Sequence, residues 1–319
     1  MKISVIGAGA FGTAISCQLV RAGNEVLIWA YEEEVSKEIN KLHQNFTYLP
    51  DIILEQSLRA TSSLDEALEF SKINYLVTPI FVLPSVLPKR GEGRIFICAS
   101  KGITKGTFLV GHEVAKGVVA GDYKWAVISG PSFAKEVAEG KNTKVVLACE
   151  DLRVAAKVRK TIETLNFKVD ICRDVVGVEL CGALKNVLAV LAGMIVGAGM
   201  GRDFAAICFT EGLCEMIRIG EAMGAVPQTF YMVCGVGDLF LTSTSDQSRN
   251  FSYGFVLGSG DALNKSNAKN VVEGVETSEA VYNLSKKFKL KTPLFDNVYE
   301  VLFNGKSSKK ALADIWRAI

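Results

Sequence analysis

The feature that most constrains this chain is a glycine-rich turn directly after its first apolar run. Residues 7–12 read Gly-Ala-Gly-Ala-Phe-Gly, a G-x-G-x-x-G pattern that follows the apolar residues 3–6. A helical pattern then continues to about residue 22, Gly23-Asn24 interrupts it, and a second apolar run covers residues 25–30. A strand, a helix and a strand of this size form a β-α-β unit. The sequence therefore predicts a parallel sheet that begins at the N-terminus.

The three glycines of this turn suit the binding of a dinucleotide. Gly7 permits a tight turn, Gly9 lets the backbone approach a pyrophosphate, and Gly12 allows close packing of the helix. Exposed N–H groups at the helix start then attract the anion. Glycines also mark ordinary turns, but this pattern lies inside a complete β-α-β unit, which favours nucleotide binding. Ala10 and Phe11, within the same turn, are also candidate cofactor contacts.

An acidic run after the second strand bears on the choice of cofactor. Glu32 lies 20 positions beyond Gly12, where an acidic residue accepts hydrogen bonds from the adenosine ribose of NAD, and Tyr31 stands beside it. The three glutamates 32–34 disfavour a 2′-phosphate, and no arginine adjoins them. The alternative is that they are solvated residues opening a helix, favoured there by the helix dipole. Both interpretations stay open, so either NAD or NADP fits the sequence.

Further apolar runs predict two domains of different architecture. Residues 75–77, 95–99, 125–128 and 145–149 are short, apolar and typical of buried strands. After about residue 175 the pattern becomes helical, over residues 178–196, 204–223, 277–290 and 294–303. We expect an α/β Rossmann domain with a mainly parallel sheet at residues 1–175. We expect an all-α domain for substrate binding and catalysis at residues 176–319.

Composition narrows the class of protein. The chain has 36 basic and 34 acidic residues, so its formal charge of +2 does not favour nucleic acid as a partner. The eight cysteines form no C-x-x-C pair, and together with the absence of a signal-peptide pattern they favour reduced thiols in the cytoplasm. The apolar residues 187–201 fall short of the roughly 18 needed for a membrane span. We expect a buried helix there, no membrane insertion and no metal.

Several segments, in order along almost the whole chain, resemble the bacterial-type NAD(P)-dependent glycerol-3-phosphate dehydrogenase family. That family reduces dihydroxyacetone phosphate to sn-glycerol 3-phosphate, the backbone of glycerophospholipids. The resemblance implies a small phosphorylated triose as the substrate and NAD or NADP as the cofactor, and a homodimer is compatible with the helical half. The matching blocks are residues 7–13, 100–103 (Ser-Lys-Gly-Ile), 129–136 (Ser-Gly-Pro-Ser-Phe-Ala-Lys-Glu), 183–187 (Ala-Leu-Lys-Asn-Val), 235–239 (Gly-Val-Gly-Asp-Leu), 247–250 (Gln-Ser-Arg-Asn) and 271–274 (Val-Val-Glu-Gly).

By this resemblance, three residues form the reaction centre. Lys185 matches the catalytic acid/base, and its apolar surroundings are expected to lower its pKa by desolvation. Lys101 follows a strand, at the sheet edge where α/β proteins gather ligands, and the resemblance places it near nicotinamide and substrate. Asp238 matches a residue that contacts substrate and the catalytic lysine. Taken singly, each has an ordinary alternative: a snorkelling lysine, a solvated loop lysine and a helix-capping aspartate.

The resemblance also implies residues that bind the substrate phosphate and the nucleotide. Hydroxyl, amide and guanidinium donors suit a phosphate, and Arg249 provides the strongest charge-assisted bonds. Without the resemblance, Ser-Arg-Asn is only a polar loop. The implied substrate-binding residues, besides the reaction centre, are Gly130, Ser132, Thr242, Ser248, Arg249 and Asn250. The implied cofactor-binding residues, besides the glycine turn with Tyr31 and Glu32, are Lys101, Ala134, Arg249, Val271 and Glu273.

Two other functions remain compatible with the sequence. A β-hydroxyacid or 3-hydroxyacyl-CoA type dehydrogenase shares the two-domain plan and can use a Lys-Asn pair, although residues 248–250 favour a small phosphorylated ligand. An NAD(P)-sensing regulator needs no proton donor, so Lys101, Lys185 and Asp238 argue against it. His43 and His112 match no catalytic motif. Residues 10–11 and 78–81 depart from the usual family pattern, which affects cofactor fit and leaves the reacting groups intact.

Overall fold

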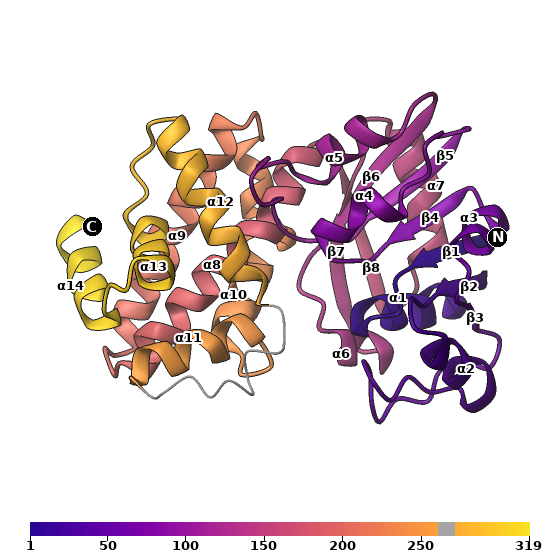
Figure 1. The fold of residues 1–319 in the computed structure, drawn as a ribbon, viewed down its shortest axis with the longest axis horizontal. Coiled ribbons are helices and arrows are strands. Elements are labelled where there is room, and N and C mark those ends of the chain that lie inside the picture. The colour runs from indigo at the N-terminus through magenta and orange to yellow at the C-terminus, as the bar shows by residue number, and fades with distance from the viewer. Residues whose placement is uncertain (261–271) are drawn as a thin grey trace. The chain divides into compact units, whose positions relative to one another are not determined.

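The computed structural model describes residues 1–260 and 272–319, which form two compact units (Figure 1). The first unit comprises Met1–Ser100 and Gly111–Val175, and the second comprises Lys101–Val110 and Val176–Ile319. The ten-residue segment Lys101–Val110 thus leaves the first unit after a strand and groups with the second. Lys101 therefore shares a unit with Lys185 and Asp238.

An eight-stranded sheet forms the centre of the first unit. The strand order is β3-β2-β1-β4-β5-β6-β7-β8, and every neighbouring pair is parallel except β6 with β7. The predicted mainly parallel sheet is confirmed, and two strands, β3 and β8, were not predicted. The bounds are β1 Lys2–Ile6, β2 Glu25–Trp29, β3 Arg59–Thr61, β4 Ile73–Leu76, β5 Arg94–Cys98, β6 Tyr123–Ser129, β7 Thr143–Ala148 and β8 Phe167–Cys172.

Helices cover the sheet, and the strand order reverses direction at β1. β1 lies between β2 and β4: strands β2 and β3 extend the sheet to one side of β1, and β4 and the later strands extend it to the other. In sheets of this kind ligands bind at the carboxyl ends of the strands, where the strand order switches sides. The central strands are buried, as their β-branched and aromatic residues require. The helices are α1 Ala10–Arg21, α2 Glu33–Leu42, α3 Leu64–Phe70, α4 Leu83–Val86, α5 Gly111–Val118, α6 Ala134–Ala138 and α7 Leu152–Ile162, with a 3-10 turn at Ile80–Val82.

Among its described residues the second unit contains helices, turns and loops and no strand, which confirms the predicted all-α half. Four helices were predicted, whereas α10, α11 and α14 were not. The helices are α8 Val175–Gly197, α9 Arg202–Ala222, α10 Asp238–Thr244, α11 Arg249–Ser259, α12 Glu273–Lys287, α13 Pro293–Phe303 and α14 Ser308–Ala318, with a 3-10 turn at Pro227–Tyr231 and a π-helical turn at Val233–Gly237.

Among the residues that the structure describes, α8 is the one helix that is long and apolar enough to cross a membrane by length and composition. In its most apolar window 83% of the residues are buried inside the protein, as expected for a core helix. The apolar sequence run continues to Gly201, but the helix ends at Gly197 and a turn follows. Helix α8, which contains Lys185, is therefore a buried core helix of its unit.

Glycines let α8 and α11 cross at very short range. A Cβ added to Gly193 of α8 would lie 2.0 Å from the carbonyl oxygen of Phe251, and one added to Gly254 of α11 would lie 2.0 Å from that of Val190. Side chains at these positions would force the helices apart. The contact brings the start of α11 beside the lysine-bearing part of α8. Its four glycines are Gly193, Gly197, Gly254 and Gly258.

Candidate active site

Lys185 and Asp238 form a buried ion pair in the second unit. The Lys185 Nζ donates to Asp238 Oδ1 at 2.5 Å, and the two side chains are 6% and 1% exposed. Asp238 is the first residue of α10, directly after the π-helical turn, a type of turn that is frequent at functional sites. The N-cap position of this helix is occupied by Gly237, so Asp238 is not the capping residue, and its carboxylate pairs with the lysine.

Lys101 and Thr242 complete this cluster. The Lys101 Nζ donates to the second oxygen of Asp238, Oδ2, at 3.1 Å, so one carboxylate holds two ammonium groups. The Thr242 hydroxyl accepts from Lys185 Nζ at 2.8 Å and donates to the backbone carbonyl of Asp238. The structure therefore brings together four of the residues that the sequence assigned to the site, although they span positions 101 to 242.

Two cations share one anion, and this sets the protonation states. Burial disfavours the Lys185 ammonium, and the nearby Lys101 cation adds to that effect against the attraction of Asp238, so the pKa of Lys185 is lowered to about 7. Burial also acts to lower the pKa of Lys101, but Asp238 outweighs it and raises that pKa. Burial acts to raise the pKa of Asp238, and the two lysines reverse this and hold it low.

These protonation states define what the cluster can do. Lys185 can give up and regain a proton near neutral pH, which is the property of a general acid/base. Lys101 stays cationic and can polarise a nearby oxygen, and Asp238 stays anionic and orients both ammonium groups. The expectation that desolvation lowers the pKa of Lys185 agrees with this geometry.

A chain of side-chain amides links the lysine helix to two other helices. Asn186 Nδ2 donates to Glu273 Oε2 at 2.9 Å, and Asn186 Oδ1 accepts from Asn250 Nδ2 at 3.0 Å. Asn250 Oδ1 in turn accepts from the backbone N–H of Gly274 at 2.9 Å. Asn186, buried next to Lys185, was not assigned to the site from sequence. An amide adjoining a lysine on a mostly apolar helix was the available signal.

The start of α11 offers donors for an anion. Ser248 is buried as the N-cap residue, its hydroxyl accepting from the N–H of Phe251 at 3.2 Å. Arg249 is the first residue of the helix and its side chain is exposed. Since Asn250 bonds to Asn186, this helix start is tied to the residue beside Lys185. A cation and backbone N–H groups at a helix start suit a phosphate.

The glycine turn of the first unit fits a dinucleotide. Gly7 has φ +116°, and a Cβ on Gly12 would lie 1.9 Å from the Gly7 carbonyl oxygen, so both positions need glycine to close the turn onto α1. A Cβ on Gly9 would meet no atom within 4 Å, so this part of the backbone faces open space. The surface that Gly9 leaves bare is the one that a pyrophosphate requires.

Partnerless hydroxyls at the carboxyl ends of the strands also fit a ligand there. Thr78, Ser100 and Ser129 follow or end β4, β5 and β6, and their side-chain oxygens are buried without a hydrogen-bond partner in the described part of the chain. Buried hydroxyls ordinarily find partners, so the ribose and amide groups of a dinucleotide suit this edge. The residues present therefore fit a nicotinamide dinucleotide.

The remaining residues of the 129–136 block lie at the same edge. A Cβ on Gly130 would lie 2.9 Å from the Val145 Cα, so Gly130 is needed for packing against β7. The Ser132 hydroxyl donates to the Gly130 carbonyl at 2.9 Å, which folds the turn on itself. Ala134 is the first residue of α6 and is half-buried against the core.

The other cofactor candidates have different surroundings. Ala10 and Phe11 begin α1 and pack partly against the core. Tyr31 is 80% exposed, with its ring edge-on to Trp29 at 6.3 Å between centroids. Glu32 Oε1 accepts from the Tyr48 hydroxyl at 2.7 Å. Val271 lies outside the described residues.

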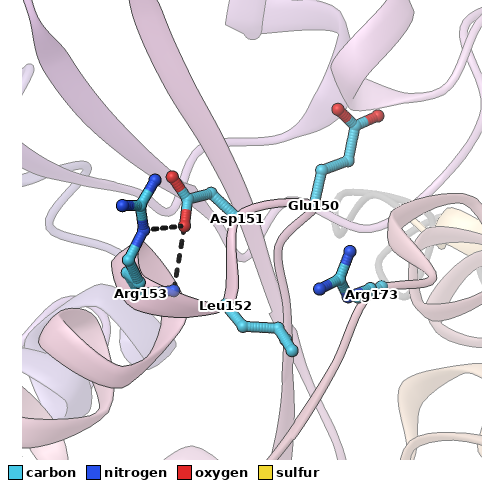
Figure 2. A pocket seen from close by; sticks show the side chains of 5 residues that line it. All are labelled: Glu150, Asp151, Leu152, Arg153 and Arg173. Atoms are coloured by element: carbon cyan, nitrogen blue, oxygen red, sulfur yellow. Dashed lines mark hydrogen bonds and ion pairs between the residues drawn. The ribbon is translucent and has the colours of Figure 1, made fainter.

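A separate surface hollow in the first unit contains none of the candidate residues. Figure 2 shows it between the ends of β7 and β8, lined by Glu150, Asp151, Leu152, Arg153 and Arg173. Asp151 accepts from the backbone N–H and the guanidinium of Arg153, so these charges satisfy each other. No group of three or more His, Cys, Asp or Glu side chains that could hold a metal ion occurs among residues 1–260 and 272–319.

Two family models match nearly all of the chain. The NAD-dependent glycerol-3-phosphate dehydrogenase N-terminus matches residues 2–155, and the C-terminus of the same family matches residues 174–313. The glycerol-3-phosphate dehydrogenase (NAD(P)+) of Geobacter sulfurreducens is 40% identical over 324 residues, covering 98% of this chain and 96% of that protein. The protein of the same description from Staphylococcus haemolyticus is 37% identical, with 98% and 97% covered.

Solved structures agree with this likeness. The crystal structure of glycerol-3-phosphate dehydrogenase from Coxiella burnetii is 32% identical, with a TM-score of 0.91 over 99% of this chain and 98% of that chain. A D-mandelate dehydrogenase with NADH, at 16% identity and a TM-score of 0.60 over 97% and 99% of the two chains, shares the fold alone.

Proposed function

The chain belongs to the NAD-dependent glycerol-3-phosphate dehydrogenase family, and we propose that it interconverts dihydroxyacetone phosphate and sn-glycerol 3-phosphate through the cluster around Lys185. The chain is an NAD(P)-dependent oxidoreductase with a Rossmann unit and a helical unit. The observation that carries the assignment of residues is the single carboxylate of Asp238, which holds Lys185 and Lys101 together in a buried setting.

In the reductive direction, NADH or NADPH held at the glycine turn would supply a hydride to the carbonyl carbon of the substrate. The Lys185 ammonium donates its proton to the carbonyl oxygen, which becomes the 2-hydroxyl of glycerol 3-phosphate. Lys101 remains cationic and stabilises the charge that develops on this oxygen. Asp238 keeps both lysines in place, and Thr242 fixes Lys185 through its hydroxyl. In the oxidative direction the neutral Lys185 amine takes up the hydroxyl proton.

The start of α11 is proposed to bind the substrate phosphate. The Arg249 guanidinium provides a cation with paired donors, and the Asn250 amide and Ser248 hydroxyl adjoin it. The bonds from Asn186 to Glu273 and Asn250 support a fixed separation between this phosphate site and Lys185. In this proposal the phosphate positions the substrate so that its carbonyl oxygen meets the ammonium group.

The first unit is proposed to bind the dinucleotide and the second to provide substrate binding and catalysis. Gly7, Gly9, Ala10, Phe11 and Gly12 form the pyrophosphate turn, supported by the open space at Gly9. Further proposed ligand contacts are Tyr31, Glu32, Lys101, Gly130, Ser132, Ala134, Arg249, Val271 and Glu273. Supply of glycerol 3-phosphate for glycerophospholipids, in the cytoplasm, is the proposed cellular role.

A spectrophotometric assay tests this function. Purified protein is mixed with dihydroxyacetone phosphate and either NADH or NADPH, and cofactor oxidation is followed by absorbance. Phosphorylated substrate is expected to be reduced, while unphosphorylated dihydroxyacetone reacts far more slowly because it lacks the group that Arg249 binds. Turnover of a 2-keto acid with none of dihydroxyacetone phosphate would overturn the proposed substrate and leave the fold intact.

A further inference from the structure

A short segment between α2 and β3 is attached to the glycine turn through one buried asparagine. Asn45 Nδ2 donates to the carbonyl oxygen of Ala8 and to the hydroxyl of Thr13, both at 2.8 Å. Asn45 Oδ1 accepts from the backbone N–H of Tyr48 at 3.1 Å, and Asn45 is fully buried. The position of Tyr48 is therefore fixed relative to the turn that fits the pyrophosphate.

Tyr48 in turn holds one carboxylate at the end of β2. Its hydroxyl donates to Glu32 Oε1 at 2.7 Å, which leaves Glu32 Oε2 available as an acceptor. Glu32 occupies the N-cap position of α2, yet its side chain makes no capping bond. The bond to Glu32 raises the pKa of Tyr48, so the hydroxyl keeps its proton and remains the donor at physiological pH.

The neighbouring glutamate behaves differently. Glu33, in the first turn of α2, forms an ion pair with Lys37 at 2.7 Å, and both side chains are more than half exposed. The pair within α2 agrees with the interpretation that the acidic run consists of solvated residues opening a helix. Glu32 departs from that interpretation, because its side chain bonds to Tyr48 and makes no capping bond. The pairing also engages Lys37, the basic residue nearest to Glu32 in the sequence, so this lysine is not free to compensate a phosphate.

We propose that Asn45 and Tyr48 are positioning residues that hold Glu32 as the acceptor for the adenosine ribose hydroxyls, and that they set a preference for NADH over NADPH. Glu32 Oε2 accepts from a ribose 2′-hydroxyl, as acidic residues at the end of the second strand do in NAD-binding sheets. A 2′-phosphate places a dianion against this carboxylate. Because Tyr48 prevents Glu32 from swinging away, the repulsion is not relieved by a change of rotamer.

This inference rests on the proposed dinucleotide site but not on the identity of the substrate. Cofactor binding can be measured without any ketone present, so a failure of the glycerol-phosphate assay leaves this test readable. Conversely, a chain that binds NADPH more tightly can still reduce dihydroxyacetone phosphate. The two proposals therefore fail independently.

The test is the dissociation constant of NADH and of NADPH, measured by nicotinamide fluorescence on the full chain. We expect the wild type to bind NADH at least about tenfold more tightly. Tyr48→Phe keeps the ring and removes the donor, and the loss of one hydrogen bond predicts a decrease of about threefold to tenfold in this preference. Glu32→Gln removes the charge and should abolish most of the preference. Glu34→Gln removes a charge from the same acidic run and leaves the Glu33–Lys37 pair in place, so it is the matched control and should leave the ratio unchanged.

Thermal unfolding separates positioning from a purely structural role. A partly exposed hydrogen bond contributes little to stability, so Tyr48→Phe should unfold within a few degrees of the wild type while its cofactor ratio changes. An NADPH affinity equal to or above that for NADH in the wild type overturns the proposed preference. A Tyr48→Phe variant with the wild-type ratio, beside a Glu32→Gln variant that loses it, excludes the role of Tyr48.

Discussion

Lys185 Nζ lies 2.5 Å from Asp238 Oδ1, and both side chains are almost completely buried although 53 positions separate them in the sequence. Asp238 stabilises the charged form of Lys185, whereas burial destabilises it. Because Lys101 shares the same carboxylate, Asp238 keeps a positive neighbour when Lys185 releases its proton. The cluster can thus change its charge by one proton without leaving the aspartate unpaired.

Lys185→Met should remove the proton donor while preserving volume. Since general acid catalysis contributes about 10²- to 10⁴-fold, we expect kcat for dihydroxyacetone phosphate reduction to fall by that factor. NADH affinity, measured by fluorescence titration, should stay within about twofold. Lys309→Ala, which removes an exposed lysine on α14, is the control and should leave kcat unchanged. Near-normal turnover by Lys185→Met would falsify the proposed role of Lys185.

The pH profiles of the two directions should be opposite. The pKa of Lys185 is lowered to about 7, so the ammonium that reduction requires is lost as the pH rises through this value. The amine that oxidation requires is lost as the pH falls through it. We expect kcat/KM for reduction to decline above about pH 7 and kcat/KM for oxidation to decline below it, because kcat/KM reports the ionisation of the free enzyme, measured well below saturating substrate across about pH 5.5 to 9.

Lys101→Gln tests the origin of that profile. The Lys101 cation is one of the causes that lower the pKa of Lys185, so its removal should shift the alkaline limb of the reductive profile to higher pH. The absolute rate should also fall, because a charge near the developing oxyanion is lost. An alkaline limb at the same pH in both proteins would show that Lys101 does not set the protonation of Lys185.

The sequence predicted the parts of the fold that have a strong local pattern. The glycine turn and the long apolar α8 follow from periodicity and turn chemistry that a single segment contains. Strand β3 has only three residues, Arg59–Thr61, and α10 has seven, so both are too short to show a repeating pattern of apolar residues. Their formation depends on neighbours: β3 pairs with β2, and α10 continues a π-helical turn.

For the candidate site, the sequence named the charged residues and the polar residues Thr242 and Asn250, but it missed two buried asparagines. Lys101, Lys185 and Asp238 were assigned through the family resemblance, and the structure brings them together. Asn186 and Asn45 were not assigned, because the partners that reveal their roles lie far away in the sequence. Asn186 meets Glu273 across 87 positions, and a side-chain bond of that separation leaves no local pattern.

Arg249→Ala should weaken substrate binding more than catalysis. The exposed guanidinium at the start of α11 is proposed to bind the phosphate, and a charge-assisted hydrogen bond contributes about 1.5 to 3 kcal/mol. We expect kcat/KM for dihydroxyacetone phosphate to decrease roughly 10- to 150-fold, mostly through KM. The same variant should lose little with unphosphorylated dihydroxyacetone. An equal loss for both substrates would place Arg249 away from the phosphate.

Asn186→Ala should separate the phosphate site from the lysine. It removes the bonds to Glu273 and Asn250, which together contribute about 2 kcal/mol. We expect KM for dihydroxyacetone phosphate to rise on the order of tenfold, with kcat reduced less. Asn283→Ala is the matched control, because that exposed amide on α12 donates to the backbone carbonyl of Glu279, one turn earlier in the same helix. A variant with lowered stability and an unchanged KM would indicate a structural role only.

Gly254→Ala should force apart the two helices that carry the lysine and the phosphate donors. The new Cβ would lie 2.0 Å from the Val190 carbonyl oxygen of α8, so the contact cannot close without backbone movement. Overpacking of this kind costs about 1 to 3 kcal/mol, which exceeds the gain of up to about 1 kcal/mol from replacing a helical glycine. We expect a lower unfolding temperature by calorimetry and a higher KM. Gly117→Ala on α5, where a Cβ meets no atom within 4 Å, should instead be neutral or stabilising. If both variants gained stability alike, the glycines between α8 and α11 would not be setting the distance from Asn250 to Asn186.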